Sequence, residues 1–175
     1  LGTTLAVLVA GWLGAWMFGA TAGIIAGSVL AGILMLGFEA RIAKTDAMLL
    51  ATAMFAQAAL ARLYVGHREG VPPSRATSWV FWAAQGAAIL IKGPVVPLLS
   101  ALTVAAVAFF DKDRAWLRQL KPLGGVLLAI LICVPWLALI TIESGAAFWR
   151  ESVGKDLLSK VGGGQESHGA PPGYY

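Results

Sequence analysis

Long apolar stretches alternate with short polar ones along the chain, and this pattern predicts a bundle of membrane helices. Six stretches have the composition of a membrane span: residues 4–18, 21–38, 48–65, 79–91, 95–110 and 123–142. The first two belong to one nearly continuous apolar run. As a single helix of about 33 residues it would measure roughly 50 Å, against a hydrocarbon core of about 30 Å. We therefore expect the chain to fold back near residues 18–23 and to form two helices there.

Individual residues predict how these helices pack and where they end. Thr45 or Asp46 is suited to cap the third helix. Gly93 and Pro94 are expected to end the fourth, and Pro135 predicts a kink or a break in the sixth. The second helix is rich in small side chains that permit close packing in lipid. These residues are Gly23, Ala26, Gly27, Ser28, Ala31 and Gly32.

The region from residue 143 onward is too polar to span a membrane. Within residues 146–161, apolar side chains recur at helical spacing with charges between them. This pattern is typical of an amphipathic helix in the membrane interface, where it either contacts lipid headgroups or simply packs. We expect a transmembrane region, residues 1–142, followed by a truncated interfacial helix and loop, residues 143–175.

Composition supports a membrane protein. The chain is 58% hydrophobic and 13% charged, whereas soluble domains are about 25% charged. Its net charge of +4 therefore relates to orientation in the membrane, and no nucleic-acid partner is expected. The single cysteine, Cys133, excludes an intrachain disulfide and is expected to be a small buried apolar residue. The chain has no P-loop or dinucleotide-binding fingerprint, so no nucleotide cofactor is expected.

The distribution of charge predicts which side of the membrane each loop occupies. The turn at residues 66–78 and the loop at 111–122, taken with Arg62, carry a net charge of +4. The remaining charged residues, at 39–46, at Lys92 and from residue 143 onward, sum to zero. Cytoplasmic loops carry the excess of Lys and Arg, so the first set is expected in the cytoplasm and the second outside it or in the periplasm.

Two polar islands between apolar stretches hold the first candidates for chemistry. Asp46 is placed either to interact with a helix N-terminus or to act as a general base or position an acceptor. Glu39, Arg41 and Lys44 form either an interfacial salt-bridge network or a phosphate-binding group. Lys92 is either a snorkelling lysine or a partner for an anionic lipid phosphate, to which Lys binds as a point charge.

The C-terminal stretch holds a candidate metal site. Glu166 and His168 lie two residues apart, and zinc accepts both ligand types. Two ligands from one loop do not complete a site, so others would have to come from elsewhere. His67 is a turn residue on the other side of the membrane, and no function is expected there.

The order of five motifs resembles that of a known family. The motifs are residues 39–50 (Glu-Ala-Arg-Ile-Ala-Lys-Thr-Asp-Ala-Met-Leu-Leu), 91–94 (Ile-Lys-Gly-Pro), 134–136 (Val-Pro-Trp), 148–158 and 164–175. Their sequence along the chain is similar to bacterial glycosyltransferases of the protein O-mannosyltransferase superfamily. The most similar branch is that of the lipid A 4-amino-4-deoxy-L-arabinose transferases. Each motif alone is weak, but the ordered set covers nearly the whole chain.

This resemblance implies a GT-C fold in a bacterial inner membrane, with catalytic loops in the periplasm. The implied donor is a polyprenyl-phosphate-linked sugar, typically undecaprenyl phosphate, and the acceptor is lipid A, a protein hydroxyl or another envelope molecule. It assigns Asp46 to the active site and Lys92 to the lipid phosphate, assisted by Arg41 or Lys44. It also assigns His168, with Glu166, to a divalent metal such as Zn, Mg or Mn.

One departure from the family concerns its principal catalytic acid, which lies in a periplasmic loop after the first helix. Residues 1–38 contain no Asp or Glu. We therefore expect that acid upstream of Leu1, and we expect this chain to be an internal fragment that is inactive alone. Two other classes remain open: part of a transporter or lipid flippase, in which charged residues line a path, and a structural membrane subunit.

Overall fold

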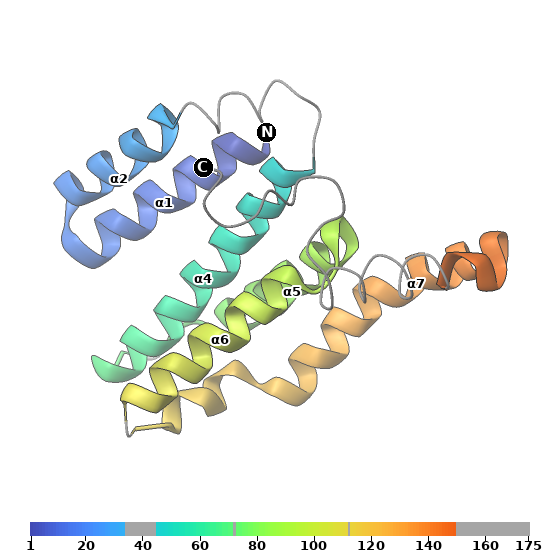
Figure 1. Cartoon of the computed structure of the whole chain (residues 1–175). Helices are drawn as coiled ribbons and strands as arrows, with labels where there is room; N and C mark the ends of the chain where they lie inside the picture. Colours follow the sequence, from blue (N-terminus) through green and yellow to red (C-terminus); the bar gives the residue numbers. More distant parts are fainter. Residues whose placement is uncertain (34–44, 72, 112, 150–175) are drawn as a thin grey trace, which may run out of the picture. The chain divides into compact units, whose positions relative to one another are not determined.

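The computed structural model describes residues 1–33, 45–71, 73–111 and 113–149. All regular structure in these ranges is helical (Figure 1). The elements are α1 (Gly2–Phe18), α2 (Ala20–Gly32), α4 (Asp46–Arg68), α5 (Arg75–Lys92), α6 (Val95–Phe110), the 3₁₀ helix η1 (Ala115–Leu120) and α7 (Pro122–Trp149). The chain divides into two compact units, Leu1–Cys133 and Val134–Tyr175. The features described below lie in the first unit unless stated otherwise.

The helices α1 and α2 form the predicted hairpin. The chain turns at Gly19, whose φ of 94° lies in a region that side chains other than glycine rarely adopt. The predicted small-residue packing is also confirmed. A Cβ atom added to Gly23 would lie 2.5 Å from both the Ala15 Cβ and the Gly11 carbonyl oxygen. Glycine at position 23 is therefore what allows the two backbones to approach so closely.

The core lies among α4, α5, α6 and η1. Leu63 on α4, Phe81 on α5, Val96 on α6 and Trp116 on η1 are all buried there. Large apolar side chains are otherwise exposed on the outer faces of α1, α2, α6 and α7. Exposure of so many large apolar side chains is typical of helices that contact lipid or another protein.

Among the residues that the structure describes, two helices are long and apolar enough to cross a membrane. They are α4, with 23 residues, and the 29-residue stretch Ala115–Glu143, which includes most of α7. Three apolar helices are shorter, with 17, 13 and 16 residues in α1, α2 and α6. A span needs about 17–25 residues. Length alone does not decide this, since α1 has 17 residues and α5 has 18. Among the described residues only α4 and the stretch Ala115–Glu143 combine sufficient length with sufficient hydropathy, so the prediction of six spans is not confirmed.

Several helix boundaries differ from those predicted, most clearly those of α5 and α7. α5 begins at Arg75, four residues before the predicted start, because the Ser74 side chain caps it by accepting a hydrogen bond from the Ala76 N–H at 3.2 Å. α7 begins at Pro122 and continues through Pro135, so no break occurs there. α7 continues to Trp149. The predicted interfacial helix was expected to begin at residue 146, and its first residues are instead part of α7. The rest of that predicted helix lies outside the described residues.

The predicted basic loop at residues 111–122 contains a buried helical turn. Its central residues form η1, with Trp116 fully buried and Leu120 nearly so. The Trp116 ring meets the Tyr64 ring edge-on, with centroids 5.5 Å apart. The sequence analysis considered only the charge of this loop and did not predict that Trp116 and Leu120 are buried. Their burial stabilises the turn against α4.

Candidate functional site

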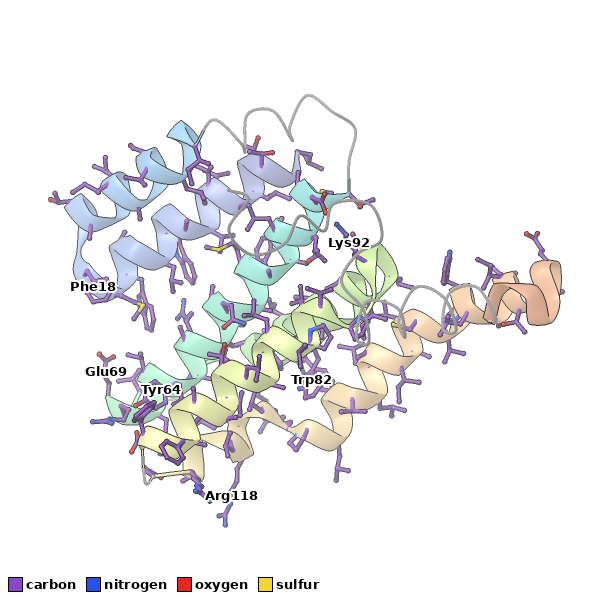
Figure 2. The ribbon with its side chains drawn as sticks, in the orientation of Figure 1. Phe18, Tyr64, Glu69, Trp82, Lys92 and Arg118 are labelled. Carbon is purple, nitrogen blue, oxygen red and sulfur yellow. The ribbon has the colours of Figure 1, made fainter. Side chains whose placement is uncertain are left out.

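The central feature of the candidate site is an ion pair between Lys92 and Asp46. Lys92 is the last residue of α5, and Asp46 is the first residue of α4. Figure 2 shows Lys92 beside the start of α4. The structure therefore brings together two predicted site residues that are separated by 46 positions in the sequence.

The two helix ends place these charges favourably. A carboxylate is stabilised near the positive N-terminal end of a helix dipole, and an ammonium near the negative C-terminal end. The Asp46 side chain is 37% exposed and the Lys92 side chain 51% exposed. The pair is thus partly screened by solvent and remains accessible to a ligand.

A glycine fixes the direction in which the chain leaves Lys92. Gly93 has a φ of 75°, and its N–H donates to the Ile89 carbonyl at 2.9 Å. Pro94 then precedes the first residue of α6. The predicted end of the helix at Lys92-Gly-Pro is confirmed, and it leaves the ammonium at a helix terminus.

The prediction that Thr45 or Asp46 caps α4 through its side chain is wrong. Thr45 occupies the N-cap position in a helical conformation, and its side chain makes no capping hydrogen bond. Asp46 lies one position further along, where its carboxylate binds the Lys92 ammonium. Packing of α4 against α5 has thus given Asp46 a partner that the local sequence did not indicate.

The other predicted site residues lie outside the described residues. This applies to Arg41, Lys44, Glu166 and His168. Within the described ranges, no group of three or more His, Cys, Asp or Glu side chains is arranged to hold a metal ion. The metal assignment of Glu166 and His168 therefore stays a prediction.

A second polar cluster lies at the C-terminal end of α4, where Figure 2 labels Tyr64. The Tyr64 hydroxyl and the Arg68 guanidinium each donate to Asp111 Oδ2 at 2.9 Å. The pKa of the Asp111 carboxyl is lowered first by the Asp113 N–H, which donates to Oδ1 at 3.1 Å, and then by Tyr64 and Arg68. This network joins the end of α4 to the segment that follows α6.

His67 connects the same segments a few residues away. Its Nε2 lies 2.9 Å from Asp113 Oδ2, and its Nδ1 lies 3.3 Å from Gln119 Nε2. The pKa of the Asp113 carboxyl is lowered first by the Ala115 N–H and then by His67. Both ring nitrogens of His67 have neighbours, so this histidine braces η1 and is poorly placed to accept a substrate proton.

Sequence reasoning missed both polar clusters at this end. The members of each pair lie 43 to 52 positions apart, so no local spacing signals them. The only available signal was the charge of the loop, which had been attributed to orientation. His67 was expected to have no function, and its contacts support a structural one.

A third polar group ties helices together inside the core. Gln57 on α4 and Gln85 on α5 both donate to the Ser100 hydroxyl oxygen on α6, at 3.2 and 2.7 Å. Gln85 and Ser100 are each 3% exposed and border an apolar pocket of about 540 Å³. Buried hydrogen bonds of this kind fix the relative positions of helices, because apolar contacts alone are not directional.

Comparisons with protein-family models, with curated proteins and with solved structures gave no match. What can be said of the class of protein therefore comes from the structure. Over the described residues it is all-helical, and it contains two helices with the length and composition of membrane spans.

Proposed function

We propose that this protein is a membrane glycosyltransferase that moves a sugar from a polyprenyl phosphate donor to an acceptor in the cell envelope. The observation that carries the proposal is the ion pair between Asp46 and Lys92. These residues come from two separate motifs of the ordered set that resembles the protein O-mannosyltransferase superfamily. Their contact supports the idea that the two motifs contribute to one site.

The reaction requires charge stabilisation at the leaving group. The acceptor hydroxyl oxygen attacks the anomeric carbon, and the bond from that carbon to the phosphate oxygen breaks. The phosphate keeps the electron pair, and the hydroxyl proton passes to a carboxylate base. A cation fixed beside the phosphate stabilises the charge that develops there. Lys92 has this role in the proposal, because its ammonium has three donors and the contact with Asp46 uses one.

The ion pair also supports a particular role for Asp46. Its Oδ1 receives the Lys92 ammonium, so the carboxylate is suited to hold that ammonium in position against solvent. Asp46 thus acts on the donor phosphate through Lys92. Arg41 and Lys44 would add positive charge near the same phosphate, and Glu166 with His168 would hold a divalent metal.

The proposed location is a bacterial inner membrane crossed several times by the chain. Two helices suited to crossing and a wide exposed apolar surface support this location. The charge distribution supports an orientation with the Asp46–Lys92 end outside the cytoplasm and the η1 end inside it.

Sugar transfer in membranes that carry the full-length protein, rather than this chain alone, tests the proposal. The donor is a radiolabelled undecaprenyl-phosphate sugar pool, and the variants are Lys92→Ala and Asp46→Ala at equal expression. Arg118→Ala is the matched control, because Arg118 is an exposed basic residue on η1 (Figure 2). We expect transfer by the wild type and by Arg118→Ala, with a loss of about tenfold or more in the other two. Transfer that is indifferent to Lys92→Ala would refute the site.

A further inference from the structure

Arg62 is a charged residue held between two tryptophans near the end of α4. Its guanidinium carbon lies 5.2 Å from the ring centroids of both Trp12 and Trp16, which come from successive turns of α1. Each distance is within the range of a cation–π interaction. The two rings orient the guanidinium without neutralising its charge.

Within the described part of the chain, Arg62 has no anionic partner. It forms no ion pair there, and its Nε is enclosed without a hydrogen-bond acceptor. An unpaired buried donor destabilises the fold, and the cost is larger for a charged group. A ligand that brings an acceptor oxygen to the guanidinium would supply the anionic partner that Arg62 lacks among the described residues.

Arg62 also lines an apolar groove, together with Trp12. The groove has a volume of about 460 Å³ and lies between α1, α4 and α5. Its lining is apolar apart from Thr77 and Arg62, and it includes Leu8, Phe55 and Val80. These three side chains are 63%, 36% and 45% exposed, so the groove opens toward the surroundings of the helices.

We propose that this groove binds an anionic phospholipid, with its phosphate on Arg62 and an acyl chain along Leu8, Phe55 and Val80. A guanidinium forms paired hydrogen bonds with phosphate oxygens, and the groove removes apolar chain from water. Trp12 and Trp16 fit this position, because tryptophan is enriched where hydrocarbon meets headgroups. Charge complementarity selects an anionic lipid over a zwitterionic one.

This lipid site is separate from the proposed transfer site. Arg62 lies sixteen residues after Asp46 on α4, which corresponds to about 24 Å at 1.5 Å per residue. The two sites therefore lie toward opposite ends of one helix. The lipid proposal does not depend on sugar transfer and can be tested without it.

Native mass spectrometry of the purified protein in detergent micelles measures the binding directly. The probes are dioleoyl phosphatidylglycerol and dioleoyl phosphatidylcholine, with glycerol 1-phosphate as a headgroup that lacks acyl chains. We expect phosphatidylglycerol to bind on the order of tenfold more tightly than phosphatidylcholine, a difference typical of one charge-assisted contact. Glycerol 1-phosphate should not displace it at equal concentration. Equal affinity for the two lipids would overturn the proposal, and so would displacement of phosphatidylglycerol by glycerol 1-phosphate at equal concentration.

Two variants and a control locate the binding. Arg62→Gln should lose the preference for phosphatidylglycerol, whereas Arg118→Gln, on an exposed arginine outside the groove, should keep it. Val80→Trp fills the groove but retains Arg62, and it should weaken the binding of both lipids on the order of tenfold. Unchanged binding in Val80→Trp, or an equal loss in Arg118→Gln, contradicts the assignment even where Arg62→Gln does not fold.

Discussion

Replacing Gly23 by alanine should weaken the α1–α2 hairpin. The added Cβ would lie 2.5 Å from the Ala15 Cβ and from the Gly11 carbonyl oxygen, whereas carbon atoms pack at about 3.5–4.0 Å. The helices must therefore separate by about 1 Å or more locally. Forcing an extra methyl group into a well-packed contact costs about 1–3 kcal/mol.

Gly27→Ala is the matched control, because Gly27 lies one turn later on the same face of α2. Its added Cβ would lie 3.6 Å from the nearest atom, the Gly11 Cα, which is an ordinary contact. Both variants gain the same helix propensity, about 1 kcal/mol for alanine over glycine. The difference between the two variants therefore isolates the packing term, and Gly23→Ala should be less stable by about 1–3 kcal/mol.

The assay is reversible unfolding in mixed micelles with increasing sodium dodecyl sulfate. Tryptophan fluorescence follows unfolding, and two of the seven tryptophans, Trp12 and Trp16, lie in α1. The free energy of unfolding is compared between the two alanine variants. If Gly23→Ala is as stable as Gly27→Ala, the close backbone approach inferred for this hairpin is incorrect.

Three further predictions concern other contacts. Gly93→Ala should cost about 1–2 kcal/mol, because its φ of 75° disfavours a side chain, and thermal unfolding measures this. Gly125→Ala should destabilise more strongly, because its Cβ would overlap the Trp82 indole, whose Nε1–H donates to the Leu120 carbonyl. Thermal unfolding followed by circular dichroism measures this loss. Asp111 and Asp113 have folded pKa values below their ordinary 3.8, so the stability they contribute is present above about pH 4 and is lost as pH falls through the folded values. Acid titration of Asp113→Asn should show a shallower loss than the wild type.

Local features were predictable from the sequence because their causes are local. The turn after the first helix follows from the length of the apolar run and the glycine at position 19. The end of α5 follows from Gly93 and Pro94, which cannot continue a helix. Close packing of α2 follows from its small side chains, since only these allow two backbones to approach.

Features that depend on tertiary packing were not predictable. Asp46 and Lys92 were assigned to one side of the membrane, but their contact depends on how α4 and α5 pack. The burial of Trp116 was not predicted, because its segment was interpreted from charge alone. That burial depends on a surface formed by other helices. The contact of His67 with Asp113 joins residues 46 positions apart, for which one sequence contains no spacing signal.

Exchange of the two charges tests the central claim most directly. The double variant Asp46→Lys with Lys92→Asp, made in the full-length protein, can restore an ion pair between α4 and α5 while moving the cation away from position 92. We expect it to regain thermal stability lost in the single variants but to transfer sugar from undecaprenyl phosphate at less than about a tenth of the wild-type rate. Wild-type transfer by the exchanged protein would show that Lys92 serves only to hold the helices together, and would contradict its role at the donor phosphate.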